Sequence, residues 1–200
     1  FLHAHKLIRK IGGWMPKESD LGTEKWNRCF EIVNDNFYFI EAERYDLDTV
    51  LKKGAELVKR KGIKCLVIDP YNKVKMKGAS DMSIPDATME YLAKIEAFAK
   101  KYDVLVVVVA HPTKMYKKDD GTIDEPTMYN IKGGGEWYDA SYHGLLVHRD
   151  YTNNSVKVKV LKVKFQNLGE NQAEAHFKWN HASGDYMPLS EVPSGPMPWD

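Results

Sequence analysis

The sequence predicts an α/β fold with a mainly parallel central sheet, and three observations carry this prediction. Two apolar runs, KCLVID (64–69) and VLVVVVAH (104–111), lack the alternation of polar residues that marks a half-exposed strand. Such runs are typical of parallel strands that are covered on both faces. A segment with helical periodicity lies between them, and this order predicts a right-handed βαβ unit. Further strands near the C-terminus, separated by short polar turns, predict an antiparallel meander that extends the sheet.

The elements before the first parallel strand are predicted from periodicity and from helix-end signals. Residues 2–13 indicate a short helix that closes on a pair of glycines, and FYFIEA (37–42) indicates a short strand. The segment 46–62 has apolar residues at helical spacing, with Asp46 placed as its N-cap and Gly62 at its end.

The remaining elements are predicted in the same way. A second amphipathic helix is expected around 91–102, and it leads into the second parallel strand. Residues 112–141 show no clear periodicity, and a loop of this length in a compact domain is usually functional or mobile. We expect one domain over 1–184 and a flexible tail over 185–200, which is rich in Pro, Ser and Gly. The strands of the meander are expected at 142–150, 156–166 and 173–180.

Composition and charge exclude several classes of protein. The chain has 200 residues, of which 43% are hydrophobic and 28% charged, the balance of an ordinary globular domain. Its formal net charge is +1, so any nucleic-acid site must be a local patch. Cys29 and Cys65 show neither CxxC spacing nor a disulfide framework, which favours a reducing compartment. No apolar run reaches membrane-spanning length, and the first residues have no signal-peptide pattern.

Two polar residues follow the predicted parallel strands, at the sheet edge where ligands gather in an open α/β fold. Asp69 ends the first strand and His111 ends the second, and the βαβ connection makes these strands neighbours or near-neighbours. We therefore expect both side chains at the same edge of the sheet. An alternative stays open, in which Asp69 caps the next helix and His111 is an ordinary loop histidine.

These strand ends, in their order and spacing, resemble a known family of motors. An apolar strand ending in Asp resembles a Walker B element, whose acid holds Mg²⁺ on a nucleotide. The next apolar strand, with its polar end, resembles the element that senses the terminal phosphate. Together with GLLVHRD (144–150) and VLKVKFQNLGE (160–170), they resemble the RecA-like ATPase core of ring-shaped replicative DNA helicases of the Twinkle, phage primase-helicase and DnaB type. The resemblance covers about residues 1–184 and implies a three-layer RecA-like fold.

The resemblance implies roles for the two strand ends and for the long loop. Asp69 matches the Walker B acid, and His111 matches the phosphate sensor that couples nucleotide state to DNA contact. NIKGGGEWYDAS (130–141) matches the loop that grips the backbone of single-stranded DNA in the channel of the ring, although Tyr138 and Asp139 depart from the family's basic or polar pattern. A plain flexible hinge is the alternative for the glycine run. The loop residues implied in DNA binding are Lys132, Gly133, Gly134 and Gly135.

The C-terminal strands carry the other implied nucleotide contacts. Lys162 and Lys164 match the basic fingers that reach the γ-phosphate on a neighbouring subunit. Family members often have Arg at the second position, and Lys164 keeps the charge without the bidentate fork. Arg149 and Trp179 match the residues that sandwich the base. The alternatives are that the lysines form the wet face of a strand and that Trp179 packs in the core.

The resemblance implies a function that these residues cannot complete by themselves. No G-x-x-x-x-G-K-[ST] motif occurs in the sequence, so we expect an incomplete core, cut just after the Walker A loop, that does not hydrolyse ATP alone. The parent protein would use ATP and Mg²⁺, act on single-stranded DNA as a hexameric ring, cooperate with a primase, and work in the cytoplasm of a bacterial or phage-infected cell. The alternatives are a degenerate, non-catalytic RecA-like module that binds DNA or protein, and a recombinase-type ATPase of the same superfold.

Overall fold

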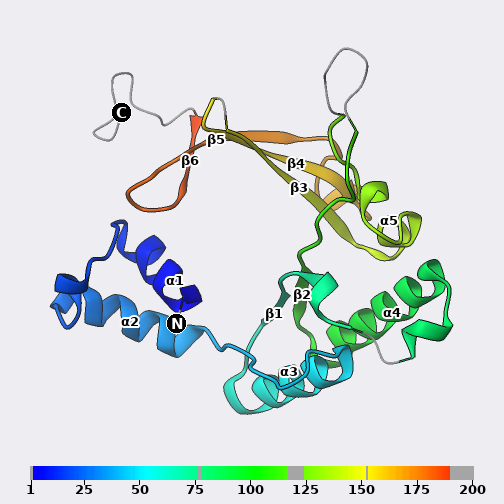
Figure 1. Ribbon diagram of the computed structural model, residues 1–200, viewed down its shortest axis with the longest axis horizontal. Coiled ribbons are helices and arrows are strands. Elements are labelled where there is room, and N and C mark those ends of the chain that lie inside the picture. The colour runs from blue at the N-terminus through cyan, green and yellow to red at the C-terminus, as the bar shows by residue number, and fades with distance from the viewer. Residues whose placement is uncertain (1, 76–77, 117–123, 152, 190–200) are drawn as a thin grey trace. The chain divides into compact units, whose positions relative to one another are not determined.

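The computed structural model describes residues 2–75, 78–116, 124–151 and 153–189 (Figure 1). The chain divides into two compact units. The first comprises residues 1–38, 145–160 and 172–200, and the second comprises residues 39–144 and 161–171.

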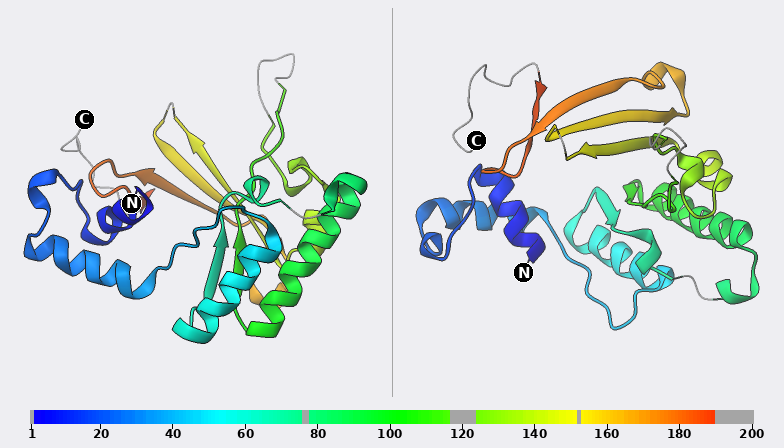
Figure 2. Two further views of the ribbon diagram at one scale, coloured as in Figure 1. Left: turned by 60° about the horizontal axis from the view of Figure 1, so that its bottom comes forward. Right: turned by 45° about the horizontal axis from the view of Figure 1, so that its top comes forward.

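The second unit contains the predicted βαβ arrangement. Strands β1 (Cys65–Ile68) and β2 (Leu105–Val108) pair in parallel, with Ile68 opposite Val108. Helices α3 (Leu47–Lys61) and α4 (Ile84–Tyr102) lie side by side on one face of this pair (Figure 2, left). The neighbour relation of the two strands is therefore confirmed.

Local signals explain where α3 and α4 begin and end. The Asp46 carboxylate accepts a hydrogen bond from Thr49 N, and Gly62 ends α3 with a left-handed φ of 67°. Ser83 caps α4 by accepting from Asp86 N, and Asp103 ends it in the left-handed region. The predicted helix at 46–62 is confirmed, and α4 starts earlier than the predicted 91–102.

The two faces of the β1–β2 pair differ in exposure. Leu66 and Ile68 are buried under α3 and α4, whereas Val67 and Leu105 are 57% and 60% exposed. The expectation that both faces are covered is therefore wrong for this chain. An unbroken apolar run indicates that both faces of a strand are apolar, but it does not indicate which of the two faces a helix covers.

The N-terminal part of the first unit is a helix pair. Helices α1 (Leu2–Gly12) and α2 (Glu24–Asn36) pack around a small core of Ile8, Cys29 and Val33. The helix predicted at 2–13 is confirmed, whereas α2 was not predicted, because its pattern of buried residues is sparse.

The strand predicted at 37–42 is wrong. Phe37 N donates to Val33 O and so closes α2, and the residues after it form no strand. Phe37 and Phe39 are 43% and 50% exposed. Strand propensity without a neighbouring strand is not enough to form a sheet.

The C-terminal strands form a four-stranded sheet in the order β3–β4–β5–β6, and the β4–β5 and β5–β6 pairs are antiparallel. The predicted antiparallel meander is confirmed, with one more strand than expected, but in the described residues it forms a sheet of its own and does not extend the β1–β2 pair. Strand β6 lies in the segment predicted as a tail, so that prediction is wrong for its residues, and positions 190–200 lie outside the described residues. The strands are β3 (His143–Asp150), β4 (Ser155–Val163), β5 (Glu174–Trp179) and β6 (Tyr186–Pro188).

Short helical segments occupy the connections. Residues 112–141 were expected to lack regular structure, but their described part contains the 3₁₀ turn η4 (Met128–Asn130) and the short helix α5 (Gly135–Ala140). In the described ranges, none of the helices is both long and apolar enough to cross a bilayer. The other 3₁₀ turns are η1 (Glu18–Asp20), η2 (Tyr71–Lys73), η3 (Ala79–Asp81) and η5 (Gln166–Leu168).

Candidate functional site

Asp69 and His111 follow neighbouring strands, as the sequence predicts. Asp69 comes directly after β1, and His111 lies three residues beyond the end of β2. Val109 N donates to Ile68 O at 2.8 Å, so the last residue of β1 is hydrogen-bonded to the residue just after β2. Both side chains are exposed. The next helical turn, η2, has Pro70 at its N-cap, which removes the alternative that Asp69 caps it.

The surroundings of Asp69 restrict which metal could bind there. In the described part of the chain, no group of three or more His, Cys, Asp or Glu residues gathers to hold a metal ion. A single exposed carboxylate fits Mg²⁺ bound mainly by waters and nucleotide phosphates, because Mg²⁺ is commonly held through one or two carboxylates. It does not fit a metal site made entirely of protein ligands.

An isolated antiparallel bridge links His111 to the glycine-rich loop. Pro112 pairs with Ile131, and Thr113 N donates to Asn130 O at 2.7 Å. Antiparallel pairing places the residue before Pro112 opposite the residue after Ile131. The backbone positions of His111 and Lys132 are therefore neighbours across this bridge.

The backbone of Lys132 is anchored on the core of the second unit. Its carbonyl accepts hydrogen bonds from Tyr71 Oη and Trp137 Nε1, each at 3.1 Å. Trp137 is 3% exposed, and its ring centroid lies 4.8 Å from that of Tyr71. Burial raises the pKa of the Tyr71 phenol above its ordinary value. The Lys132 side chain itself is exposed.

The three glycines of the loop have different environments. Gly133 has a φ of +100°, and a Cβ there would lie 2.3 Å from Thr88 Oγ1 on α4. Gly134 also has a positive φ, of +50°, whereas Gly135 begins α5 with no close neighbour. The run is therefore packed against α4 at its first glycine, which does not match a plain hinge.

Lys162 and Lys164 lie at the end of β4 and have different partners. The Lys162 ammonium donates to the carbonyl of Tyr138 and, at 3.3 Å, to that of Asp139, at the C-terminal end of α5. Burial, and then the nearby Lys164 charge, lower the pKa of the Lys162 ammonium. Lys164 is exposed, with its ammonium 4.3 Å from the centroid of the Tyr142 ring.

The lysines earlier in β4 are engaged in ion pairs. Lys157 and Lys159 lie 3.8 and 3.2 Å from the Glu174 carboxylate on β5. These two lysines therefore pair with the neighbouring strand β5, whereas Lys162 contacts α5 and Lys164 contacts the Tyr142 ring.

Arg149 and Trp179, predicted to sandwich a base, are brought together in the first unit. The Arg149 guanidinium carbon lies 5.3 Å from the Trp179 ring centroid and 4.8 Å from that of Tyr151. Trp179 is half-buried beside Tyr186, with ring centroids 5.0 Å apart. Arg149 Nε is buried without a hydrogen-bond partner. This pair forms a cation–π stack, and its role with a nucleotide stays a prediction.

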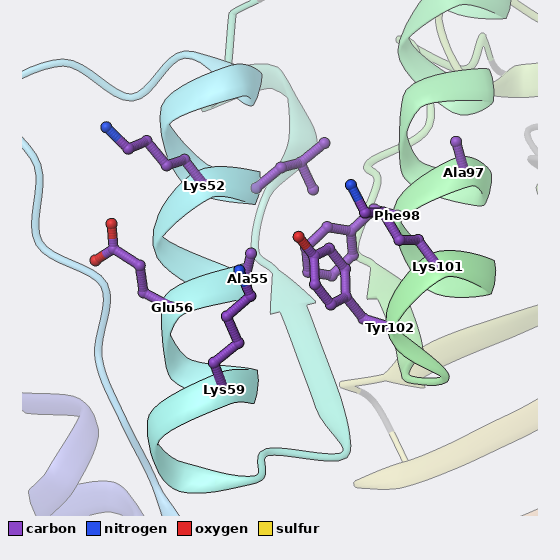
Figure 3. Close-up of a pocket in the computed structure, with 9 residues that line it drawn as sticks. Lys52, Ala55, Glu56, Lys59, Ala97, Phe98, Lys101 and Tyr102 are labelled. Carbon is purple, nitrogen blue, oxygen red and sulfur yellow. The ribbon is translucent and has the colours of Figure 1, made fainter.

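Two hollows are lined by residues of the second unit. One, of about 500 Å³, adjoins the glycine-rich loop and is lined by Lys132, Thr88 and Trp137 among others. The other, of about 460 Å³, is a groove between α3 and α4 over which Lys59 and Lys101 extend (Figure 3). No predicted site residue lines this groove.

Comparison with known proteins finds a relative of similar sequence and a solved structure of similar fold. No family model matches the chain. It is 30% identical over 216 aligned positions to the "Twinkle homolog protein, chloroplastic/mitochondrial" of Arabidopsis thaliana, which covers 97% of this chain and 29% of the relative. A solved DnaB-like replicative helicase, described with its interactions with primase, superposes with a TM-score of 0.72 at 14% identity, over 94% of this chain and 49% of that one. This chain has the RecA-like fold of a replicative helicase core.

The chain spans less than a third of the Twinkle homolog and about half of the DnaB-like chain. Sequence reasoning missed the residues that hold its glycine-rich loop in place, Tyr71, Thr88 and Trp137. Tyr71 stands two residues after Asp69 and Trp137 two after the glycines, so proximity to the candidate residues was the available signal.

Proposed function

We propose that this helicase core forms part of the motor of a replicative DNA helicase that hydrolyses ATP at subunit interfaces. The motor would translocate on single-stranded DNA and unwind the duplex. The observation that carries the proposal is the bridge between Pro112 and Ile131, which sets His111 opposite Lys132. This pairing connects the strand end that would meet a nucleotide phosphate to the loop that would meet DNA.

Each candidate residue has a defined task in this proposal. Asp69 would hold Mg²⁺, which neutralises phosphate charge in phosphoryl transfer when ATP is bound. His111 would contact the terminal phosphate, and a shift of its backbone would pass across the bridge to Lys132. Lys164, which is exposed, is better placed than Lys162 to reach a phosphate on another subunit. Arg149 and Trp179 would stack on the base.

The assembly and setting follow from the same proposal. Basic fingers that act on a neighbouring subunit require an oligomer, and we propose a hexameric ring that can work with a primase. Cys29 and Cys65 are both free thiols, which suits a reducing compartment such as the cytoplasm of a bacterial or phage-infected cell.

Binding of the 200-residue chain to a fluorescein-labelled oligo(dT) tests the DNA-binding part. We expect affinity to fall as salt rises, because lysine contacts release counterions from the strand. Lys132→Ala should weaken binding and reduce the magnitude of the log–log salt slope by about 0.7, the value for one phosphate contact on single-stranded DNA. Lys52→Ala, which removes an exposed lysine on α3, is the matched control and should leave both unchanged. Equal effects of the two substitutions would refute the assignment of the loop.

A second candidate function is a non-catalytic DNA-binding module with a helicase fold. The absence of a Walker A motif from these 200 residues favours it. Both candidates predict oligo(dT) binding, and they differ in whether the longer protein turns over ATP.

A further inference from the structure

The Lys162 ammonium caps the C-terminal end of α5. The last carbonyls of any helix lack partners within the helix. In α5 the Tyr138 and Asp139 carbonyls have this position, and the Lys162 ammonium donates to both. A cation at a helix C-terminus is also favoured by the peptide dipoles.

The Lys162 ammonium also contacts the Tyr138 ring, which connects α5 to η4, the turn before the glycines. Lys162 Nζ lies 4.6 Å from the centroid of the Tyr138 ring. That ring stacks on Tyr129 of η4, with centroids 5.2 Å apart and planes 19° from parallel. Tyr129 and Tyr138 lie on opposite sides of the glycine run in sequence, so this stack closes the loop that contains Lys132.

Helix α5 depends on such contacts, because a helix of six residues is not stable by itself in water. Its N-terminal half is held by Trp137, which is buried in the core and donates to Lys132 O. Its C-terminal end is held by Lys162. The next lysine, Lys164, contacts the Tyr142 ring and offers a comparison at the same end of β4.

We propose that Lys162 is a positioning residue, which fixes α5 and the Tyr129–Tyr138 stack and thereby holds Lys132 in the geometry that meets DNA. The inference rests on the proposed function only for the role of Lys132. It assigns Lys162 to the DNA-binding loop of its own chain, in addition to any contact with a nucleotide on another subunit.

Hydrogen exchange measured by mass spectrometry tests the structural part. In Lys162→Met, amides of 135–141 should exchange about tenfold faster, because a charge-assisted cap is lost. Exchange in α3 and α4 should be unchanged, which shows that the variant is folded. Lys162→Arg, which keeps the positive charge and N–H donors, should retain most of the protection. Lys164→Met is the matched control and should leave exchange in 135–141 at the wild-type rate.

Oligo(dT) binding in a double-mutant cycle tests the positioning part. Lys162→Met should weaken binding more in the wild-type background than when Lys132 is already Ala, because in the second case only the glycine contacts still depend on the position of the loop. A direct phosphate contact by Lys162 would weaken binding equally in both backgrounds and would overturn the proposal. Unchanged exchange in 135–141 would also overturn it. If no variant, nor the wild type, binds oligo(dT), the proposed function fails, while the exchange experiment still decides whether Lys162 holds α5.

Discussion

Gly133 shows how one residue constrains the candidate DNA loop. Its φ of +100° is a conformation that side chains rarely adopt, and a Cβ would lie 2.3 Å from Thr88 Oγ1. Gly133→Ala should therefore lower the free energy of unfolding by about 1–3 kcal/mol for the backbone alone, with a further loss from the clash. Urea unfolding of the 200-residue chain measures this change.

Two further variants separate the two causes of the expected stability loss at Gly133, which are the steric clash and the backbone conformation. Gly135→Ala places a Cβ no closer than 4.0 Å to Tyr129 and should change stability by less than about 1 kcal/mol. Thr88→Ala combined with Gly133→Ala should recover most of the part due to the clash, because Thr88 Oγ1 and Cγ2 are removed while its Cβ still lies 3.0 Å from the added Cβ. It should recover none of the part due to φ. Equal losses for Gly133→Ala and Gly135→Ala would contradict the packing described for the loop.

Among the elements, α3 depends on its cap. The Asp46 carboxylate accepts hydrogen bonds from Thr49 N at 3.0 Å and from Thr49 Oγ1 at 2.9 Å. Asp46→Ala should lower the free energy of unfolding by about 1 kcal/mol, whereas Asp46→Asn, which can still cap, should lose much less. Urea unfolding curves of the three proteins provide the test, and similar losses for Ala and Asn would show that the cap is not what Asp46 supplies.

A second element-level prediction concerns pH and the contact between α4 and the start of β3. The hydrogen bond from Lys100, and then that from Tyr142, lower the pKa of the Glu96 carboxyl. A carboxyl with a lowered pKa stabilises the fold above its unfolded pKa of about 4.5, and this contribution is lost as pH falls through the folded value. The effect is small, because the group is largely exposed and solvent screens the ion pair.

Thermal unfolding of the wild type and Glu96→Gln, compared from neutral pH to acid, measures this contribution. The wild type should be the more stable protein at neutral pH, and the difference should shrink below pH about 4.5. A difference that is constant with pH would mean that the carboxylate charge contributes nothing.

The elements also show what the sequence could predict. Helix α3 was predicted because Asp46, Gly62 and its apolar face are local signals. Helix α5 was not predicted, because Trp137 and Lys162 hold it through contacts made only in the folded chain. The strand expected at 37–42 also depends on contacts in the folded chain. It does not form, because its aromatic residues have no neighbouring strand to pair with.

For the whole molecule, the sequence placed the candidate residues better than it placed their surroundings. Strand ends and motif order predicted that Asp69 and His111 share a sheet edge. The bridge from Pro112 to Ile131 could not be predicted, because it joins residues across an aperiodic segment. The exposed face of β1 and β2 was missed because apolar character does not indicate which face is covered.

The prediction at this scale concerns ATP turnover. The 200-residue chain should show no Mg-dependent ATPase activity, because it contains no Walker A motif to hold the β- and γ-phosphates. A phosphate-release assay with and without oligo(dT) measures this, and Asp69→Ala is the control for contaminating activity. Turnover that disappears in Asp69→Ala would show that the chain hydrolyses ATP without that motif.

Lys162, at the end of β4, would also limit how the two proposed ligands, a nucleotide phosphate and DNA, affect each other's binding. An ammonium has three N–H donors, and Lys162 directs its donors at two carbonyls of α5. A phosphate that drew the ammonium away would compete with those carbonyls, so its binding free energy would be reduced by the cost of releasing α5. By thermodynamic reciprocity, DNA that tightens the loop would weaken the attraction of Lys162 for that phosphate by the same factor. The contact would thus make the two ligands antagonists, with a strength set by one shared side chain.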